Sequence, residues 1–391
     1  MSQTSRVAAP LSNPAPKPAF PFLDLQAQFA TIRQEVMAAV TRVMESQHFI
    51  LGPEVTAFEQ EVKPQVGCEH IFGCASGSDA LLLALMALGV GPGDEVIAPP
   101  FTFVATAGAI ARLHARTVFI DIDPETYNLD PQQLERLITP RTKAIIPVHL
   151  FGLAADMDEI LKVSDHHGVP VIEDAAQAIG AKYKGKAVGS MGAFGCFSFF
   201  PSKNLGGAGD GGLIATNDAK LAAKLKILRV HGSPRKYEYE VVGMNSRLDA
   251  LQAAILRVKL KYLDCWAAGR QRNAGRYRAL LAQHGLADKV CPPRPRPDYV
   301  HVYNQFTIRT SRRDQLKAHL QAHGIPTEIY YPHPLHLQPA FAGLEYRPGA
   351  FPVSEAASRE ALSLPIFPEL TEAQQQQVVT AMAEFFRDNR R

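Results

Sequence analysis

The sequence has few cysteines, and their spacing forms no short motif. Their number is odd and no C-x-x-C pair occurs: Cys68, Cys74, Cys196, Cys265 and Cys291. This pattern suits neither a disulfide framework nor a cysteine-bound zinc or iron–sulfur centre. We therefore expect the protein to work in the reducing cytoplasm.

Long apolar runs and blocks of one charge are also missing. The run "ALLLALMALGV" from Ala80 falls short of the roughly 18 to 20 residues that a membrane-spanning helix needs. The amino terminus has no continuous apolar core of the kind found in export signals. Basic and acidic residues nearly balance, 41 against 38, and the basic clusters are short. We expect no membrane span and no nucleic-acid partner.

The H-E-x-x-H motif is absent despite thirteen histidines. The closest spacing, His333 and His336, has a proline between its members, which rules out a regular helical pair. No G-x-S-x-G occurs after a strand. The sequence therefore supports neither a metal site nor a Ser-His-Asp hydrolase.

Short apolar runs alternate with helix-like segments from Phe22 onward, and this alternation predicts an α/β fold with a largely parallel sheet. The expected strands are 71–74, 95–98, 117–120, 144–148, 170–172, 195–200 and 213–216. A helical stretch is then expected over 246–285. After it the residue pattern changes, and one strand is expected in "YNQFTIRT". We divide the chain into a mobile proline-rich tail (1–21), a large domain (22–260) and a small α/β domain (261–391).

Polar residues follow three of the expected strands, at the edge where open α/β sheets bind ligands. After the first strand, Gly77 allows a tight turn and a helix begins near Asp79, so that its first amides and the hydroxyls of Ser76 and Ser78 could hold a phosphate. An ordinary turn capped by serine would show the same residues. Glu173, Asp174 and Gln177 follow the second strand, where Asp174 could instead cap a helix. Lys203 follows the third strand within "FSFFPSKNLGGAGDGG" and could be a surface lysine. It precedes its glycines, so the segment is not a Walker A loop.

Together these features meet the needs of pyridoxal 5'-phosphate. That cofactor requires a lysine to form an imine, an acid beside the pyridine nitrogen and a hydroxyl-rich phosphate pocket. A carboxylate near the nitrogen favours the protonated ring, which accepts electrons when the substrate amine loses its α-proton. A lysine released from the imine is placed to move that proton.

Nine motifs in order resemble the DegT/DnrJ/EryC1/StrS family of sugar aminotransferases, which use pyridoxal phosphate. The resemblance covers the chain from Phe22 onward. The motifs are "PFLDLQAQF" (21–29), "FILGPEVTAFEQE" (49–61), "SGSDAL" (76–81), "PPFTFVATA" (99–107), "FIDIDPETYNLD" (119–130), "VHLFGLAADMDEI" (148–160), "VIEDAAQAIGA" (171–181), "FSFFPSKNLGGAGDGG" (197–212) and "GMNSRLDALQAAIL" (243–256).

The resemblance implies a type I fold of this cofactor class, with a seven-stranded, mostly parallel sheet. It also implies that Lys203 binds the cofactor covalently and Asp174 pairs with the ring nitrogen. The other implied cofactor contacts are Gln177 at the ring hydroxyl, Phe103 near the ring, Gly77, Ser78 and Ser198 at the phosphate, and Asn245 from a neighbouring subunit. The implied active unit is thus a homodimer. Ser78 replaces the family's usual threonine, and its hydroxyl can make the same hydrogen bond.

The stretch "GIPTEIYYPHPLHLQPAF" (324–341) resembles the segment that enters the active site in family members acting on 3-keto nucleotide sugars. Tyr331, His333 and His336 are therefore candidate substrate contacts, although the two histidines could simply fill a turn. Arg235 and Lys236 are candidate cations for the nucleotide diphosphate.

We expect transfer of an amino group from L-glutamate to C3 of a keto-hexose, by way of pyridoxamine 5'-phosphate. The sugar is expected to be UDP-linked with a 2-acetamido group, or dTDP-linked and 6-deoxy. Two other enzyme functions remain open: amination at C4, and a cofactor-matched enzyme acting on amino acids through an arginine such as Arg309. A binding or regulatory protein is a third possibility, but it predicts loss of Lys203 or Asp174, and both are present.

Overall fold

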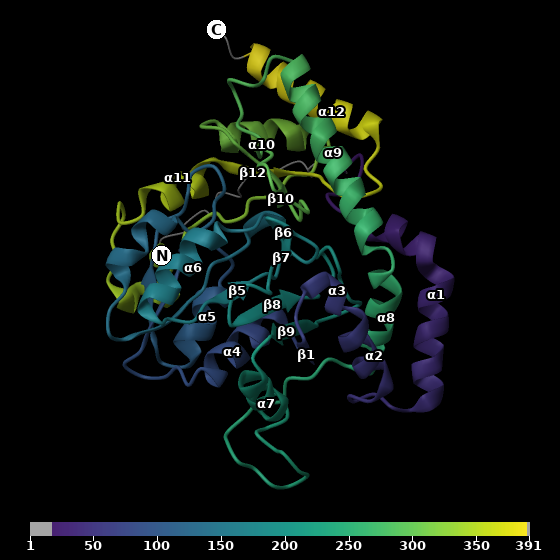
Figure 1. The fold of residues 1–391 in the computed structure, drawn as a ribbon. Helices are drawn as coiled ribbons and strands as arrows, with labels where there is room; N and C mark the ends of the chain where they lie inside the picture. Colours follow the sequence, from purple (N-terminus) through teal and green to yellow (C-terminus); the bar gives the residue numbers. More distant parts are fainter. Residues whose placement is uncertain (1–17, 389–391) are drawn as a thin grey trace, which may run out of the picture.

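The computed structural model describes residues 18–388 (Figure 1). Residues 1–17 of the expected tail lie outside this range. Of the remainder, Ala19 donates its N–H to the carbonyl of Gly324, and Phe20 is buried in the core of the carboxyl-terminal half. The packed chain therefore begins before Phe22.

A seven-stranded sheet forms the centre of the molecule. Its strands are β1 (His70–Cys74), β2 (Glu95–Ala98), β3 (Arg116–Phe119), β4 (Thr142–Ile145), β5 (Ile172–Asp174), β8 (Phe194–Ser198) and β9 (Gly212–Thr216). The orders β3-β2-β4 and β1-β9-β8-β5 are joined by parallel bridges from Ile145 to Val171 and from Val148 to Asp174. Only β9 runs antiparallel to its neighbours. The expected mostly parallel α/β fold is confirmed.

Side chains along each strand alternate between two apolar cores. On β8, Cys196 packs on one face of the sheet and Phe197 on the other. On β2, Ile97 and its neighbour Val96 divide in the same way. Because helices cover both faces, the strands are apolar on both sides, and this is why the sequence shows continuous rather than alternating apolar runs.

The helices of the large lobe take their places around this sheet. Helix α4 (Gly77–Ala87) packs against β1, β8 and β9, and helix α7 (Ala219–Leu228) packs against β1 and β9. The other helices are α1 (Leu25–Ser46), α2 (Pro53–Glu61), α3 (Lys63–Val66), α5 (Ala105–Arg112), α6 (Met157–His167) and α8 (Ala250–Leu260). The loop between α7 and α8 projects from the body of the molecule (Figure 1). No helix among residues 18–388 combines the length and apolar character needed to cross a membrane.

A separate apolar cluster joins Phe20 to residues between 274 and 386. Its elements are α9 (Leu263–Gln283), β11 (Phe306–Arg309), α10 (Arg313–Ala322), β12 (Ala361–Leu364) and α12 (Glu372–Asp388). Helix α11 (Pro352–Glu360) packs in another cluster, where Ala357 meets Phe101 and Phe151. The short β10 (Tyr299–Val300) pairs with β6 (Lys182–Tyr183) of the hairpin that β6 forms with β7 (Lys186–Ala187). The helical stretch expected over 246–285 is interrupted between Leu260 and Leu263, and so becomes α8 and α9. The domain division at residue 260 stays a prediction.

Replacing Phe20 by alanine should lower the free energy of unfolding by about 3 kcal/mol, because it empties a buried aromatic position. The matched control is Phe29→Ala on α1, where the ring is exposed and the expected change is within about 0.5 kcal/mol. Urea unfolding followed by the fluorescence of Trp266, the single tryptophan, measures both. Equal stability of the two variants would show that the segment before Phe22 does not support the core.

Candidate active site

Lys203 lies in the turn between β8 and β9. Its N–H donates to the carbonyl of Phe200, 2.9 Å away, and Phe199 exchanges hydrogen bonds with Gly207 and Gly211. A Cβ at Gly206 would overlap the carbonyl oxygen of Pro201, so this position accepts only glycine. The glycines after Lys203 are therefore explained by a tight backbone turn that holds the lysine, and not by a phosphate loop.

The Lys203 amine is an unusually weak base. Burial lowers its pKa from 10.5 to about 8, although the negative charge of Asp174 opposes this shift. The same interaction acts on Asp174, where burial raises the pKa of the carboxyl and Lys203 acts to lower it. The lysine and the acid that the sequence placed on separate strands thus feel each other's charge. A lysine with this pKa supplies a neutral, nucleophilic amine near physiological pH.

Asp174 ends β5, two residues beyond the end expected from the sequence. Its Oδ2 accepts a hydrogen bond from the Thr106 hydroxyl at 2.8 Å, and its Oδ1 accepts one from the N–H of Ala176 at 3.2 Å. A carboxylate has about four acceptor positions, so this buried group retains capacity for a further donor. A protonated ring nitrogen is such a donor.

Glu173, the other acid at this strand end, is fully occupied. Its two oxygens accept the N–H groups of Gly189, Met191 and Gly192 at 2.6 to 2.7 Å. His149 Nε2 lies 2.9 Å from Oε2, and its Nδ1 accepts the N–H of Ala155. Nδ1 is therefore unprotonated, and the neutral ring donates from Nε2.

These contacts give a physical reason for the different roles predicted for the two acids. Since the Glu173 carboxylate bonds to backbone amides and a neutral histidine, its role is to anchor β5. That anchoring holds Asp174 in place, because Asp174 also exchanges backbone hydrogen bonds with Pro147 and His149.

Two threonines also belong to the site and were not singled out in the sequence. The Thr106 hydroxyl has one proton, which goes to Asp174. The Thr102 hydroxyl lies 3.1 Å from Thr106 and must donate to it. Both lie within the motif "PPFTFVATA", so the signal was a pair of hydroxyls one helical turn apart at the start of α5.

The predicted phosphate contacts come together at the start of α4. A Cβ on Gly77 would lie 2.7 Å from the Cβ of Ser198, so glycine permits the close approach of α4 to β8. This places Ser78 in the first helical turn next to Ser198. First-turn N–H groups have no acceptor within their own helix and carry partial positive charge. The neighbouring Ser76 caps the helix by accepting a hydrogen bond from the Asp79 N–H. The segment is therefore also the serine-capped turn that the sequence allowed.

Gln177 connects the cofactor region to the segment at 324–341. Its Oε1 accepts the N–H of Phe151 at 2.7 Å, and its Nε2 donates to the Tyr331 hydroxyl at 3.0 Å. One amide N–H therefore remains for a ligand oxygen. The Tyr331 ring lies 6.5 Å from that of Phe103, which is 55% exposed, so an aromatic surface adjoins Gln177.

Two of the remaining predicted contacts, Asn245 and Arg235, lie on the projecting loop. Asn245 accepts from Arg247 at 2.6 Å, and Arg235 forms an exposed ion pair with Glu238. No contact joins either of them to Lys203 among the described residues of one chain. Both remain proposals for a site shared between subunits.

His333 is exposed, whereas His336 is buried. The His336 Nε2 lies 3.1 Å from Glu355, and its ring packs on Phe119 and Phe351. A substrate contact at His336 stays a prediction. His336 anchors the segment that carries Tyr331 and His333.

Arg309 is also engaged. Its Nη2 and Nε both bind Glu360, at 2.7 and 3.1 Å, and its Nη1 donates to the carbonyl of Pro124. An arginine held in this way does not present its guanidinium to a substrate α-carboxylate. The structure thus gives no support to the amino-acid alternative at this residue.

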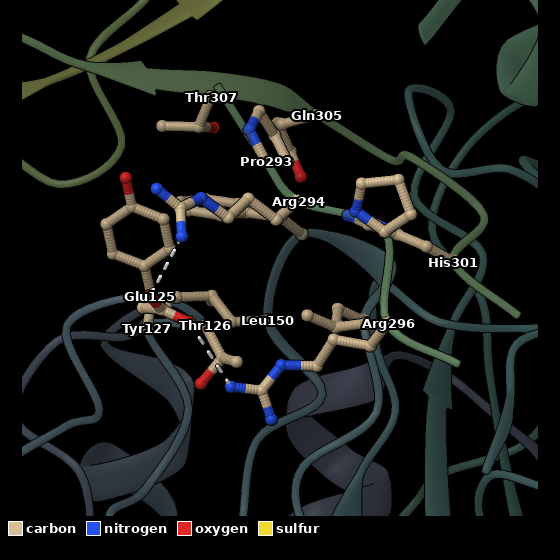
Figure 2. A pocket seen from close by; sticks show the side chains of 13 residues that line it. Glu125, Thr126, Tyr127, Leu150, Pro293, Arg294, Arg296, His301, Gln305 and Thr307 are labelled. Carbon is tan, nitrogen blue, oxygen red and sulfur yellow. Dashed lines mark hydrogen bonds and ion pairs between the residues drawn. The ribbon is translucent and has the colours of Figure 1, made fainter. Parts of the chain in front are cut away.

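A cavity of about 120 Å³ lies apart from Lys203 (Figure 2). Arg294 and Arg296 face Glu125 across it, at 3.5 and 3.9 Å, and none of the predicted site residues lines it. Its volume is smaller than the roughly 300 Å³ typical of small-molecule pockets. It shares Phe151 with the site, but we place the candidate active site at Lys203.

The residues around Lys203 fit pyridoxal phosphate. A buried acid with spare acceptor capacity, a lysine of lowered pKa and a glycine-lined helix start lie at adjoining strand ends. Asp174 would hold the ring nitrogen, Gly77, Ser78 and Ser198 the phosphate, and Lys203 the aldehyde carbon. When bound, the cofactor supplies an electron sink for carbanions formed next to an amine.

Comparisons with known proteins agree with this geometry. The profile of the DegT/DnrJ/EryC1/StrS aminotransferase family matches residues 30–383. The chain is 53% identical to a pleiotropic regulatory protein of Geobacillus stearothermophilus, over 94% of this chain and 98% of the relative. It is 49% identical to the UDP-N-acetyl-3-dehydro-alpha-D-glucosamine 3-aminotransferase of Acidithiobacillus ferrooxidans, over 93% and 97%.

Among solved structures, the chain resembles DesV of S. venezuelae in complex with a ketimine intermediate. The TM-score is 0.91 at 45% identity, and the match covers 94% of this chain and 99% of that one. The likeness therefore extends over the fold and the region that carries the site.

The pH dependence of cofactor capture tests the environment of Lys203. Only the neutral amine attacks an aldehyde, so the rate at which the cofactor-free protein binds pyridoxal phosphate should rise with pH and level off above about 8. In Asp174→Asn the midpoint should fall further, because the charge that raises the Lys203 pKa is gone. Absorbance in a stopped-flow instrument follows the reaction, with Lys203→Ala as the blank. A midpoint near 10.5 would contradict the assignment.

Proposed function

Because the chain belongs to the DegT/DnrJ/EryC1/StrS aminotransferase family, we propose that it transfers an amino group to C3 of a keto-hexose linked to a nucleotide diphosphate. The protein is an aminotransferase that uses pyridoxal phosphate. The observation that carries this function is that Lys203, in the turn after β8, and Asp174, at the end of the neighbouring parallel β5, lie close enough for the charge of each to act on the pKa of the other. It also speaks against a purely regulatory role, since a protein without catalysis needs neither a buried lysine of lowered pKa nor a buried acid beside it.

Amination at C3 is supported by the relative that acts on a 3-dehydro sugar. That relative's UDP-N-acetyl sugar makes a UDP-linked 2-acetamido-3-keto sugar our preferred substrate. Tyr331 and the exposed His333 are the proposed contacts for sugar hydroxyls, and the first is oriented by its hydrogen bond to Gln177.

The residues of the site divide the chemistry between them. Asp174 holds a proton on the ring nitrogen, and Thr106 fixes the orientation of its carboxylate. In the first half-reaction Lys203 would take the proton from the carbon that carries the donor amine, and in the second it would deliver a proton to C3 of the acceptor. Between these two steps the amino group would be carried from donor to acceptor on the bound cofactor. With a pKa of about 8 it can both accept and donate at neutral pH. We propose L-glutamate as the donor.

We further propose that two chains share each active site. The projecting loop carries large apolar side chains that one chain leaves in solvent, including Tyr237, 78% exposed, and Val242, 90% exposed. Contiguous exposed apolar surface indicates an interface. The same loop leads to Asn245 and carries Arg235, so docking it on a second copy would bring a phosphate contact and a cation to the partner's Lys203 region.

The substrate is tested by incubating the purified protein with ¹⁵N-glutamate and matched pairs of 3-keto and 4-keto sugars, each as UDP and dTDP derivatives. Mass detection should find the label in the amine from the UDP-linked 2-acetamido-3-keto sugar first. Lys203→Ala should form no labelled amine. Preferred amination of a 4-keto sugar, or activity retained by Lys203→Ala, would refute the proposal.

Shared sites predict complementation between inactive chains. Lys203→Ala removes the amine, and Asn245→Ala removes the proposed partner contact. If each site draws on both subunits, mixed dimers hold one intact site, and a refolded equal mixture should recover about a quarter of the parent activity. Asn245→Ala mixed with itself is the control. Recovery no greater than the average of the two separate variants would show that each chain holds a complete site.

A further inference from the structure

Two helices of the carboxyl-terminal half carry three side chains of metal-ligand type, outside the active site. His319 lies in the last turn of α10, His323 caps the carboxyl end of that helix four residues later, and Glu384 lies on the adjacent α12. One ligand atom from each residue falls within 4.8 Å of the other two, and His323 Nε2 is 3.7 Å from Glu384 Oε2. The i, i+4 spacing places both rings on one helix face.

The hydrogen bonds of the two rings leave one nitrogen of each available. His319 Nε2 donates to the carbonyl of Ala381 at 3.0 Å, so its Nδ1 carries a lone pair. His323 Nδ1 donates to the carbonyl of His319 at 2.8 Å, so its Nε2 carries one. Histidines that bind metals are usually held in this way, with the second nitrogen donating to a carbonyl or carboxylate that fixes the tautomer.

We propose that His319, His323 and Glu384 bind a divalent cation of the Zn²⁺ class, with water in the fourth position. Two imidazoles and a carboxylate suit Zn²⁺ or Ni²⁺, whereas Mg²⁺ and Ca²⁺ prefer oxygen ligands throughout. Bonds of roughly 2.0 to 2.1 Å in tetrahedral geometry separate ligand atoms by about 3.3 Å. The three groups need to approach by no more than about 1.5 Å, which rotation of the partly exposed side chains provides.

A second group, Glu135, His166 and His167, also has its ligand atoms close together. All three residues are exposed, and His167 Nε2 already lies 2.7 Å from Glu135. Within the described chain, no carbonyl contact orients either ring. This cluster lacks the tautomer control seen on α10, so it serves as the matched control.

The consequence of binding is mechanical. Leu316 and Leu320 of α10 already pack with Val378 and Met382 of α12 in one apolar cluster. A cation held by ligands from both helices would fasten the carboxyl-terminal helix to α10. It would also stabilise the folded state, because a ligand present at a hundredfold excess over its Kd shifts the unfolding equilibrium about a hundredfold.

Isothermal titration of the chelator-treated holoenzyme with ZnCl₂ tests the site. The exposed thiols Cys265 and Cys291 are replaced by serine in every sample so that they do not compete for Zn²⁺. We expect one saturable site, and no saturable binding of MgCl₂. His323→Gln and Glu384→Gln should each weaken Zn²⁺ binding at least about tenfold, while His167→Gln should leave it unchanged.

Hydrogen exchange gives a second measurement. It compares each protein with and without Zn²⁺, so the variants need not be as stable as the parent. Zn²⁺ should slow exchange in α10 and α12 of the parent and of His167→Gln, and should have no such effect in His323→Gln. The proposal is overturned if Zn²⁺ binding survives in His323→Gln and Glu384→Gln, or is lost in His167→Gln, or if no saturable binding is found.

Discussion

The active site depends on a buried carboxylate at the end of a central strand. Asp174 is shielded from water, and burial raises its pKa, so its charged form must be maintained by neighbours. Thr106 and the Ala176 amide contribute two hydrogen bonds, and Lys203 contributes charge. A cationic ring nitrogen would donate to the acceptor position of Asp174 that these groups leave open. This need couples cofactor binding to the electrostatics of the sheet edge, and it explains why a lysine of lowered pKa lies opposite.

Rigid support surrounds that carboxylate. Glu173, its neighbour in sequence, is saturated by three backbone amides and by neutral His149, and so fixes the end of β5 without carrying out chemistry. Beside it, Gly77 at the start of α4 permits a close contact with Ser198 of β8 that any side chain would block. The chain thus positions its reactive groups through backbone contacts, which tolerate far less displacement than long side chains do.

Much of this arrangement was predictable from the sequence. The runs at 95–98 and 213–216 are mostly apolar and wholly buried because both sheet faces are covered, and this signal is local. The lysine, acid and glycine turn each follow a strand, so parallel topology alone brings them to one edge. What the sequence left open is also local in origin. Tyr331 and the buried His336 belong to one motif, and nothing in the motif says which side chain faces the site.

By itself, the sequence determined the α/β class and the cofactor chemistry, because these follow from residue types at strand ends, and it predicted Lys203 and Asp174 as cofactor contacts. Only the tertiary structure showed why Asp174 keeps room for a ligand and Glu173 does not, since Gly189, Met191 and Gly192 fold back onto Glu173. It likewise decided that Arg309 is held by Glu360, and that helices α10 and α12 bring His323 to Glu384. Contacts between residues distant in the chain leave no periodic trace in the sequence, and packing alone selects them.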